Sequence, residues 1–287
     1  MPYRKINILL NALIVLQLCF AACNERRASP DAGTDTLTYL ESPVLKDTVH
    51  FRNTVGVIDS SLKAGLMAYY PFSGDFRDAS GNGFDLTGMN GAGLGADTAG
   101  NANAAASLDG VNDFLFVNDH GRLYSDQFSV SLLFKMNNGG KRLCLASHVN
   151  YERATAFHFN LGLYADATTG FAVGRPLKYA CSAIQENDRS IEVSGRNHLT
   201  PNEWHSLVAI FNNGRLFLYI DRQLVDANEA GFNISNNCEQ SQLTIGSWWK
   251  KDGVYFDGLI DEFRLYNRAL GSSEIDYLGK PNLKPGR

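Results

Sequence analysis

The 287-residue sequence has few prolines and no large excess of charge of one sign. Both features exclude certain classes of protein. Proline occurs only 8 times against 27 glycines, so neither a proline-rich disordered chain nor collagen fits. The 26 lysines and arginines are scattered among 30 aspartates and glutamates, and no basic run is longer than two residues. Nucleic-acid-binding domains usually carry a basic face, and we therefore expect no nucleic-acid partner.

The motifs of several enzyme classes are also missing. The glycine-rich stretch 88–100 has no Gly-Lys-Ser or Gly-Lys-Thr ending, so it does not fit a phosphate-binding loop. The six histidines show no zinc-like spacing, and there is no Gly-x-Ser-x-Gly nucleophile elbow. Retaining glycosidases hold two carboxyl groups about 5 Å apart, whereas strand alternation places Asp261 and Glu262 on opposite faces. The sequence therefore predicts a protein that is not an enzyme.

One apolar run stands out, at the N-terminus. Two basic residues precede the mostly apolar stretch 6–20, and Ala21-Ala22-Cys23 follows. This pattern predicts a secretory signal over residues 1–22, because a transmembrane helix needs about 20 apolar residues. The cysteine is similar to that of the lipobox of bacterial lipoproteins, although Phe20 stands where that motif usually has leucine. Lipidation of Cys23 is favoured, and a plain secretory cut after Ala22 stays open.

Export determines the expected compartment and the state of the cysteines. A lipidated Cys23 implies a membrane-anchored lipoprotein of a bacterial cell envelope, on its periplasmic or outer surface. Three further cysteines then lie in an oxidising compartment, which permits one disulfide and one free thiol. We expect the disulfide between Cys181 and Cys238, because Cys144 lies in an apolar run and is interpreted as a small buried residue.

The mature chain divides into a polar tether over residues 23–62, one β-rich domain over 63–280 and a tail over 281–287. The predicted strands are 66–72, 113–117, 128–136, 142–149, 157–164, 171–174, 204–211, 215–221, 243–246 and 259–266. Only residues 272–278 look helical, with Ser273 and Asp276 spaced as a capping box. No repeat of 20–50 residues is found, which excludes a propeller or a solenoid. The pattern predicts a single all-β sandwich.

Alternation along individual strands supports this architecture. Within 128–136 the residues at even positions are apolar, and three of the other four are polar, so one face is expected in the core and the other wet or lightly covered. The strands 204–211 and 215–221 are separated by Asn212-Asn213-Gly214, which predicts a tight type I′ hairpin turn.

Three segments go beyond a generic β pattern. Residues 65–83 read GLMAYYPFSGDFRDASGNG and are followed by SLDGVNDF at 107–114, residues 255–270 read YFDGLIDEFRLYNRAL, and Asn-Glu-Trp-His stands at 202–205. These segments resemble the opening, closing and central elements of bacterial laminin-G-like domains in the concanavalin A-like lectin and glucanase group. The resemblance spans roughly residues 63–278. It implies a jelly roll of two curved antiparallel sheets in which the first and last strands lie side by side.

Such a neighbourhood brings acidic and amide groups of distant segments together. Asp261 has the same parity as Phe263 on the last predicted strand and is expected on the core side, where a carboxylate must be paired or bound to a cation. One hypothesis is a structural calcium ion held by Asp78, Asn82 and Asp261 with backbone oxygens. The alternative is that Asp261 caps backbone amides of the glycine-rich loop without a metal.

A candidate ligand surface is indicated by aromatic residues in the loop 248–255. Flat aromatic faces stack on sugars while neighbouring polar groups bind hydroxyls. The predicted ligand residues are Trp248, Trp249, Tyr255, Tyr151, Arg153 and His158. The alternative is that one tryptophan closes the edge of the sandwich, and Trp204 is expected in the core.

These observations favour a non-catalytic binding protein of the cell envelope. The resemblance makes a glycan the favoured partner, with a surface protein bound by an adhesion module as the alternative. A glycan-cleaving enzyme with atypical carboxylates is a second alternative. The sequence does not identify the ligand or the oligomeric state.

Overall fold

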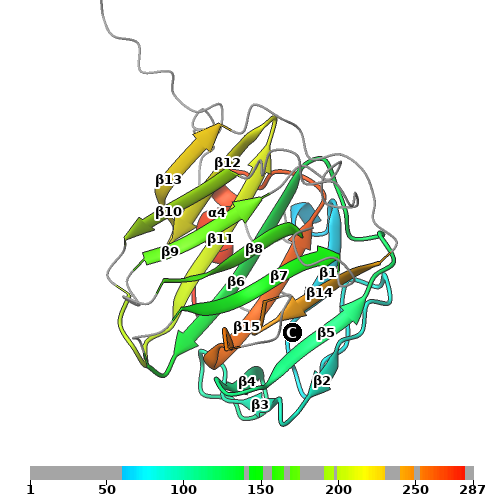
Figure 1. The fold of residues 1–287 in the computed structure, drawn as a ribbon, viewed down its shortest axis with the longest axis vertical. Coiled ribbons are helices and arrows are strands. Elements are labelled where there is room, and N and C mark those ends of the chain that lie inside the picture. The colour runs from blue at the N-terminus through cyan, green and yellow to red at the C-terminus, as the bar shows by residue number, and fades with distance from the viewer. Residues whose placement is uncertain are drawn as a thin grey trace, which may run out of the picture. The chain divides into compact units, whose positions relative to one another are not determined.

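The computed structural model describes residues 60–138, 142–150, 157–164, 169–174, 191–196, 199–229, 240–248 and 253–281. They form two packed antiparallel sheets and one short C-terminal helix, which confirms the predicted all-β sandwich (Figure 1). Within these ranges, no helix combines the length and the apolar character needed to cross a membrane.

The first sheet has eight strands, all paired antiparallel. Its order is β13 (Gln223–Glu229), β12 (Arg215–Ile220), β11 (His205–Asn212), β6 (Phe128–Met136), β15 (Asp257–Tyr266), β4 (Ala105–Asp109) and β3 (Gly93–Gly95), and β1 (Leu66–Tyr70) also pairs with β15. The second sheet has seven strands. Its order is β10 (Ile191–Arg196), β9 (Thr169–Gly174), β8 (Phe157–Leu163), β7 (Leu143–Asn150), β14 (Ser241–Ile245), β5 (Phe114–Asn118) and β2 (Thr87–Met89).

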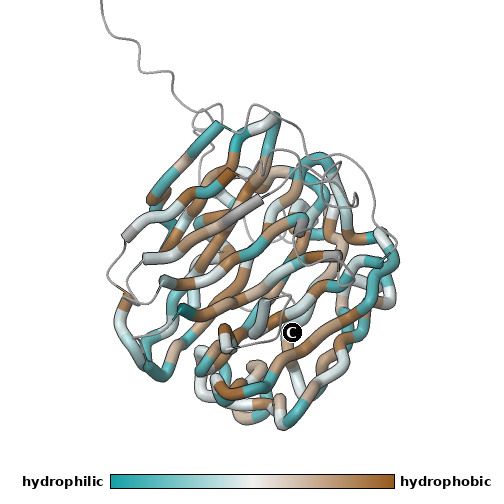
Figure 2. Tube along the Cα trace, in the orientation of Figure 1, coloured by the Kyte–Doolittle hydropathy of each residue, from teal (hydrophilic) through white to brown (hydrophobic). Residues whose placement is uncertain are grey.

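The core lies between the two sheets and follows the alternation predicted for β6. All five apolar residues at its even positions belong to one large buried cluster, and Figure 2 shows apolar and polar residues alternating along the central strands. The other face of β6 is not wet, however, because Ser129 and Ser131 are only 0% and 2% exposed. A second apolar cluster explains this burial: Val208 and Ile210 of β11 pack there against Ile275 and Leu278 of the C-terminal helix.

The first and last strands pair, as the resemblance implied. Tyr70 lies opposite Phe263 and Leu66 opposite Tyr266, and the rings of Tyr70 and Phe263 are 5.8 Å apart. The hydroxyl of Tyr70 donates a 2.7 Å hydrogen bond to the carbonyl of Phe84, so the loop after β1 is fixed to the same strand pair.

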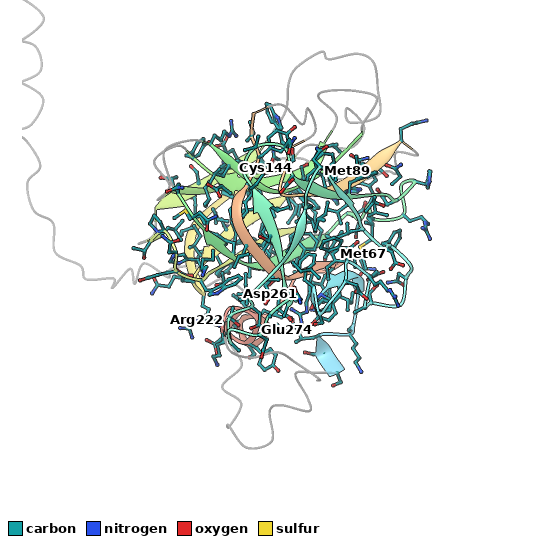
Figure 3. The ribbon with its side chains drawn as sticks, turned by 90° about the horizontal axis from the view of Figure 1, so that it is seen from below. Met67, Met89, Cys144, Arg222, Asp261 and Glu274 are labelled. Carbon is teal, nitrogen blue, oxygen red and sulfur yellow. The ribbon has the colours of Figure 1, made fainter. Side chains whose placement is uncertain are left out.

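The prediction for Asp261 is wrong in its parity. Asp261 pairs with Leu133 but Arg264 pairs with Ser131, so β15 holds one extra residue at a bulge where Glu262 has a φ of 54°. Because paired residues share a face, Asp261 lies on the outer face of the first sheet. In Figure 3 Asp261 is labelled on the side of the sandwich where the C-terminal helix lies, and it is still 0% exposed.

The bulge also overturns the expectation that the two acids point apart. Glu262 Oε2 accepts hydrogen bonds from the Tyr69 hydroxyl at 2.9 Å and from Arg264 Nη2 at 2.6 Å. Arg264 lies over the Tyr69 ring, 4.0 Å from its centroid, on the face that carries Asp261. Alternation alone does not reveal this, since one inserted residue reverses every later side chain of a strand.

The C-terminal helix α4 (Ser272–Leu278) forms where it is predicted, but its cap differs. The backbone N–H of Gly271 donates to Glu274 Oε2 at 2.8 Å, whereas the predicted capping residue Asp276 forms ion pairs with Arg222 and Lys280. The Glu274 carboxylate also binds Arg268, at 2.7 Å. Burial would raise the pKa of Glu274, but Arg268 and the Gly271 N–H lower it below its usual range.

The hairpin between β11 and β12 confirms the predicted turn, since Asn213 and Gly214 have φ angles of 48° and 74°. Strands β2, β3, β4, β10 and β13 are not among the predicted strands. The first three lie in the glycine- and alanine-rich stretch, and β13 is polar, so they lack the apolar alternation on which the prediction rests.

Candidate functional site

The residues predicted to bind calcium include the centre of a self-contained loop. Asp78 Oδ1 accepts the N–H groups of Tyr69 and Ser80 at 3.0 and 2.9 Å. Its Oδ2 accepts the Phe84 N–H at 3.1 Å and the Ser80 hydroxyl at 2.8 Å. Asn82 uses its Nδ2 to donate to the carbonyls of two β1 residues, at 3.1 and 3.0 Å.

In this loop a carboxylate caps backbone amides, as the alternative to calcium binding expected. The cap is Asp78 rather than Asp261, whose Oδ1 accepts the N–H of Glu262 at 2.8 Å. Among the described residues, no group of three or more histidines, cysteines and acids is arranged to hold a metal ion. The calcium site therefore stays a prediction.

Three of the predicted ligand residues lie in the part of the chain that the structure describes: Trp248, Tyr255 and His158. Trp248 is half-buried after the end of β14, and Tyr255 is only 8% exposed. His158 is completely buried and packs against Tyr124 and Phe128, so a ligand in solution does not reach its ring. The remaining predicted residues lie outside the described ranges: Tyr151, Arg153 and Trp249 of the ligand surface, Cys23 of the lipid anchor, and Cys181 and Cys238 of the disulfide.

Cys144 is described, and its interpretation as a buried residue is confirmed. Its side chain is 0% exposed and its thiol lies 3.2 Å from the Asn160 Oδ1. Burial raises the pKa of the Cys144 thiol far above its usual value. It is the free cysteine of the described chain.

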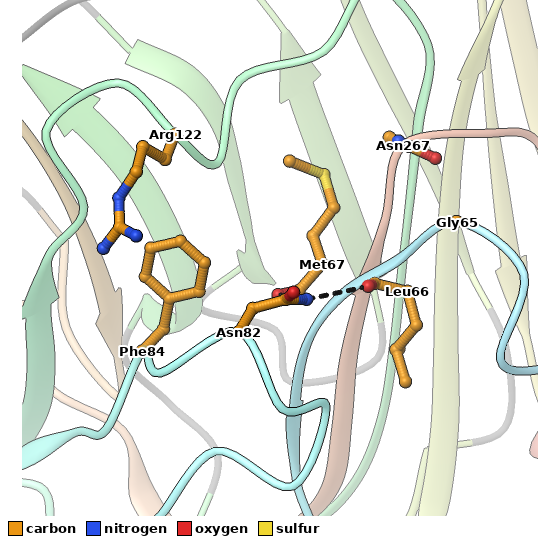
Figure 4. Close-up of a pocket in the computed structure, with 7 residues that line it drawn as sticks. All are labelled: Gly65, Leu66, Met67, Asn82, Phe84, Arg122 and Asn267. Atoms are coloured by element: carbon orange, nitrogen blue, oxygen red, sulfur yellow. Dashed lines mark hydrogen bonds between the residues drawn. The ribbon is translucent and has the colours of Figure 1, made fainter.

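An open pocket lies where the start of β1, the Asp78 loop and the loop after β5 meet (Figure 4). Its volume is about 350 Å³, within the range of small-molecule sites. The lining residues are Gly65, Leu66, Met67, Asn82, Phe84, Arg122 and Asn267. The wall therefore combines two carboxamides and a guanidinium with a thioether and an aromatic ring, a mixture suited to an amphipathic ligand.

Arg122 is the charged group of this wall. Its guanidinium lies over the ring of Phe84, 4.3 Å from the centroid, and its Nε donates to the backbone oxygen of Asp119 at 3.3 Å. Within the described ranges these are the polar and ring contacts of its side chain, so its terminal nitrogens are available to a ligand. Figure 4 shows the guanidinium and the Phe84 ring side by side at one end of the pocket.

The loop that carries Arg122 is built around the carboxylate of Asp119. Asp119 Oδ2 accepts the backbone N–H of Leu123 at 3.0 Å, and its carbonyl accepts the N–H of Arg122 at 3.1 Å. The N–H of Gly121 donates to the Ser241 hydroxyl at 2.7 Å, which ties the loop to β14. These contacts make Asp119 the organising residue of this pocket wall.

Two histidines extend this network into the core. His148 Nε2 lies 3.1 Å from Asp119 Oδ1, and His148 Nδ1 lies 3.0 Å from His158 Nδ1. All three side chains are 0% exposed. Burial alone would raise the pKa of Asp119, but the charge and hydrogen bond of His148 lower it to about 2. Burial, with the neighbouring His148, lowers the pKa of His158 well below its usual value.

The Trp-His element noted in the sequence forms a second pair of this kind. His205 Nδ1 lies 2.9 Å from Asp221 Oδ2, while the N–H of Thr200 donates to His205 Nε2 at 3.0 Å. Burial would lower the pKa of His205, but the hydrogen bond and charge of Asp221 raise it. Trp204 itself is only half-buried.

The pocket wall and the buried network were not predicted. The available signal was Asp119-His120-Gly121-Arg122 directly after a strand, because aspartate and glycine in this order are typical of a turn that bonds its own backbone. His148 and His158 are ten residues apart, and only the pairing of β7 with β8 brings them together.

This arrangement of two antiparallel sheets with a closing strand agrees with a sequence comparison. Residues 108–276 match the Laminin_G_3 family, described as the concanavalin A-like lectin/glucanases superfamily. The chain belongs to this family. The laminin-G-like domain is thereby identified over more than half of the sequence, which confirms the resemblance to the concanavalin A-like lectin and glucanase group over these residues. No curated protein is significantly similar to this chain.

Solved structures with a similar fold include binding domains. Domain 4 of AbnA, an extracellular arabinanase from Geobacillus stearothermophilus in complex with arabinotriose, is 22% identical with a TM-score of 0.52, covering 76% of this chain and 99% of that one. The botulinum neurotoxin serotype D ligand binding domain, in complex with N-acetylneuraminic acid, is 12% identical with a TM-score of 0.57, covering 76% and 51%. The binding domain of Paraclostridial Mosquitocidal Protein 1 is 16% identical with a TM-score of 0.56, covering 76% and 52%.

This chain spans about half the length of the last two structures. At these identities the likeness shows the fold. The laminin-G-like domain described here is thus a lectin-like jelly roll whose relatives in structure are mostly binding domains.

Proposed function

We propose that this protein is a non-catalytic carbohydrate-binding protein of the bacterial cell envelope, and that the pocket beside Arg122 is its binding site. The single observation that carries the proposal is this pocket, in which hydrogen-bonding side chains and apolar surface face one open space of about 350 Å³. Its place in a lectin/glucanase family makes a glycan the favoured ligand class.

The chemistry of the wall suits a sugar. A pyranose or furanose ring presents hydroxyl groups at its edge and C–H groups on its faces. The guanidinium of Arg122 offers donors in a fixed plane, and Asn82 and Asn267 offer carboxamides. Met67 provides apolar contact for a ring face. Both kinds of surface are needed for a neutral polar ligand to be held in one orientation.

The proposal is tested on a glycan array with the wild type and Arg122→Met. Methionine keeps apolar cover over Phe84 but removes the donors, so we expect each bound glycan to lose at least about tenfold in affinity. Arg77→Met is the matched control, since that side chain is 78% exposed and lies outside the pocket wall.

A wild type that retains no glycan contradicts the proposal. Binding that survives Arg122→Met but is lost in Trp248→Ala moves the site to the aromatic loop predicted from the sequence. Release of soluble sugar from a bound polysaccharide favours the enzymatic alternative instead.

The anchor and the metal belong to the same proposal. We propose that Cys23 is lipidated and holds the domain at the membrane on the polar tether. The mass of the mature N-terminal peptide tests this, because a plain signal cut leaves Cys23 unmodified. Calcium binding by Asp78, Asn82 and Asp261 is tested by adding calcium to the metal-free protein, and an unchanged melting temperature excludes a structural ion.

A further inference from the structure

The pocket proposed as the glycan site is supported by a buried network of hydrogen bonds. Arg122 lies two residues before Tyr124, whose ring packs on both His148 and His158 with centroids 4.4 and 4.7 Å apart. The same loop bonds to Asp119 through backbone and side chain, and Asp119 bonds to His148. We infer that the chain of hydrogen bonds from Asp119 through His148 to His158 positions Arg122 for ligand contact and fails when both histidines are protonated. This inference rests on the proposed function.

The proton count explains the inference. With no extra proton, His148 donates from Nε2 to Asp119 and accepts at Nδ1 from His158 Nδ1. With one extra proton, His148 still donates to Asp119 and now donates from Nδ1 to His158, which accepts. Both states keep the two hydrogen bonds. A second proton makes both Nδ1 atoms donors, 3.0 Å apart, and this contact is then repulsive.

The surroundings give a second charge little support. Among the residues that the structure describes, the titratable groups besides Asp119 that face the rings are Tyr124 from the same loop and, toward Asp119, Tyr70 of β1. β6 and β8 contribute the apolar rings of Phe128 and Phe159. The resistance of His158 to protonation agrees with this environment. One carboxylate is thus available for two imidazolium charges, and the pair accommodates only one.

Loss of the hydrogen bond between His148 and His158 is expected to disturb the pocket wall through Asp119. His148 is the partner of Asp119 Oδ1, and Asp119 Oδ2 fixes the Leu123 N–H directly after Arg122. Displacement of the His148 ring therefore removes the partner of Oδ1 and leaves the carboxylate that holds the loop with its hydrogen bonds to Leu123 and Ser241. The loop backbone is strained at His120 as well, whose φ of 52° is uncommon for a residue other than glycine, whereas Gly121 takes its φ of 78° without strain.

The test compares wild type with His158→Asn between about pH 7.5 and about pH 4, because the second proton binds below the ordinary histidine pKa of about 6.5 while Asp119 is still ionised. The carboxamide oxygen of the variant can accept from His148 Nδ1 without taking a proton. The first measurement is the hydrogen-exchange protection factor of the Gly121 and Leu123 amides. We expect it to fall about tenfold in the wild type and to stay constant in His158→Asn, as one charge-assisted bond is lost. The amides of the β11–β12 hairpin serve as the internal reference.

His120→Asn is the matched control, because His120 is an exposed histidine of the same loop. Asparagine tolerates its φ of 52°, and we expect this variant to keep the full acid sensitivity. The second measurement is affinity for the glycan selected on the array, expected to weaken about tenfold on acidification in wild type and His120→Asn only.

The two proposals fail in different ways. If no glycan binds at any pH, the proposed function fails while amide protection still reports on the loop. If wild-type protection is unchanged by acid, or if His158→Asn loses it as the wild type does, the inference is overturned. Affinity that changes while Gly121 and Leu123 stay protected also overturns it, because the loop is then not the route.

Discussion

The described residues of this domain include two histidine–aspartate pairs, which differ in burial rather than in geometry. The His148–Asp119 pair spans 3.1 Å with both side chains 0% exposed, whereas the His205–Asp221 pair spans 2.9 Å with its aspartate 36% exposed. The first lies under a loop that lines the pocket. The second fixes the turn between β12 and β13, where Asp221 and Arg222 have φ angles of 49° and 70°.

The distance between the two partners therefore does not by itself determine how an ion pair affects stability. In the exposed pair water can replace a lost partner, while in the buried pair a lost partner leaves a charge in an apolar interior. The two pairs are therefore expected to respond oppositely to pH and unequally to mutation.

The largest effect is expected for Asp119→Ala. It removes the acceptor of His148 and of the Leu123 N–H together, and breaking a buried pair typically costs about 3–5 kcal/mol in free energy of unfolding. Urea unfolding measures this change. A cost no greater than that of Asp221→Ala would erase the distinction between the two pairs.

The next effect is the acid limb of the stability curve. The pKa of Asp119 falls from 3.8 to about 2 on folding, so its contribution is complete above about pH 4 and is lost as the pH falls toward 2. By the usual conversion this is about 2 kcal/mol. We expect Asp119→Asn to flatten this limb between pH 4 and pH 2, as measured by urea unfolding at each pH. If Asp119→Asn loses stability as steeply as the wild type between pH 4 and pH 2, this acid loss comes from other carboxylates.

The His205–Asp221 pair is expected to lose its stabilising effect at high pH rather than at low pH. The pKa of His205 is raised on folding from 6.5, so its contribution is complete below that pH and is lost as the pH rises through the raised value. His205→Asn should remove this alkaline loss in a melting-temperature series from pH 5 to pH 9. The Asp119 variants should retain it.

Asp221→Ala is expected to cost less than Asp119→Ala, about 1–2 kcal/mol. It removes two hydrogen bonds, from the Ser206 N–H at 2.9 Å and from His205, at a site where water has access. Urea unfolding in parallel with Asp119→Ala gives the ratio directly.

The smallest effect is expected at the residue next to the exposed pair. Arg222 forms a 3.0 Å ion pair with Asp276, and both side chains are nearly half exposed. Such pairs contribute about 0–1 kcal/mol, so Arg222→Ala should shift the urea midpoint little, and less in high salt. A loss comparable to that of Asp221→Ala would mean that the turn depends on Arg222.

The two pairs also differ in how well they can be predicted from the sequence. Alternation in β6, the Asn-Gly turn and the matched end segments were sufficient to predict the sandwich and the pairing of β1 with β15. His205 stands in a recognisable local element. His148 carries no local signal, because its partners Asp119 and His158 reach it only through the pairing of β7 with β14 and β8.

The site was harder to predict than the fold for two further reasons. The bulge at Glu262 reverses the faces of β15, and no simple period announces an inserted residue. The pocket joins four separate segments of the sequence, and the position of Arg122 over Phe84 follows only from the way these segments fold together. The aromatic residues of the sequence were therefore a weaker guide to the pocket than the hydrogen bonding within its loops.

The pairing of β1 with β15 has a mechanical consequence. The chain enters β1 at Leu66 and leaves β15 at Tyr266, and these two residues lie opposite each other at the same end of the pair. A force that pulls the two chain ends apart therefore loads the inter-strand hydrogen bonds one after another, as in a zipper, because these bonds lie across the strands. Under tension the domain should peel open from this corner at low force, rather than resist until all bonds break together.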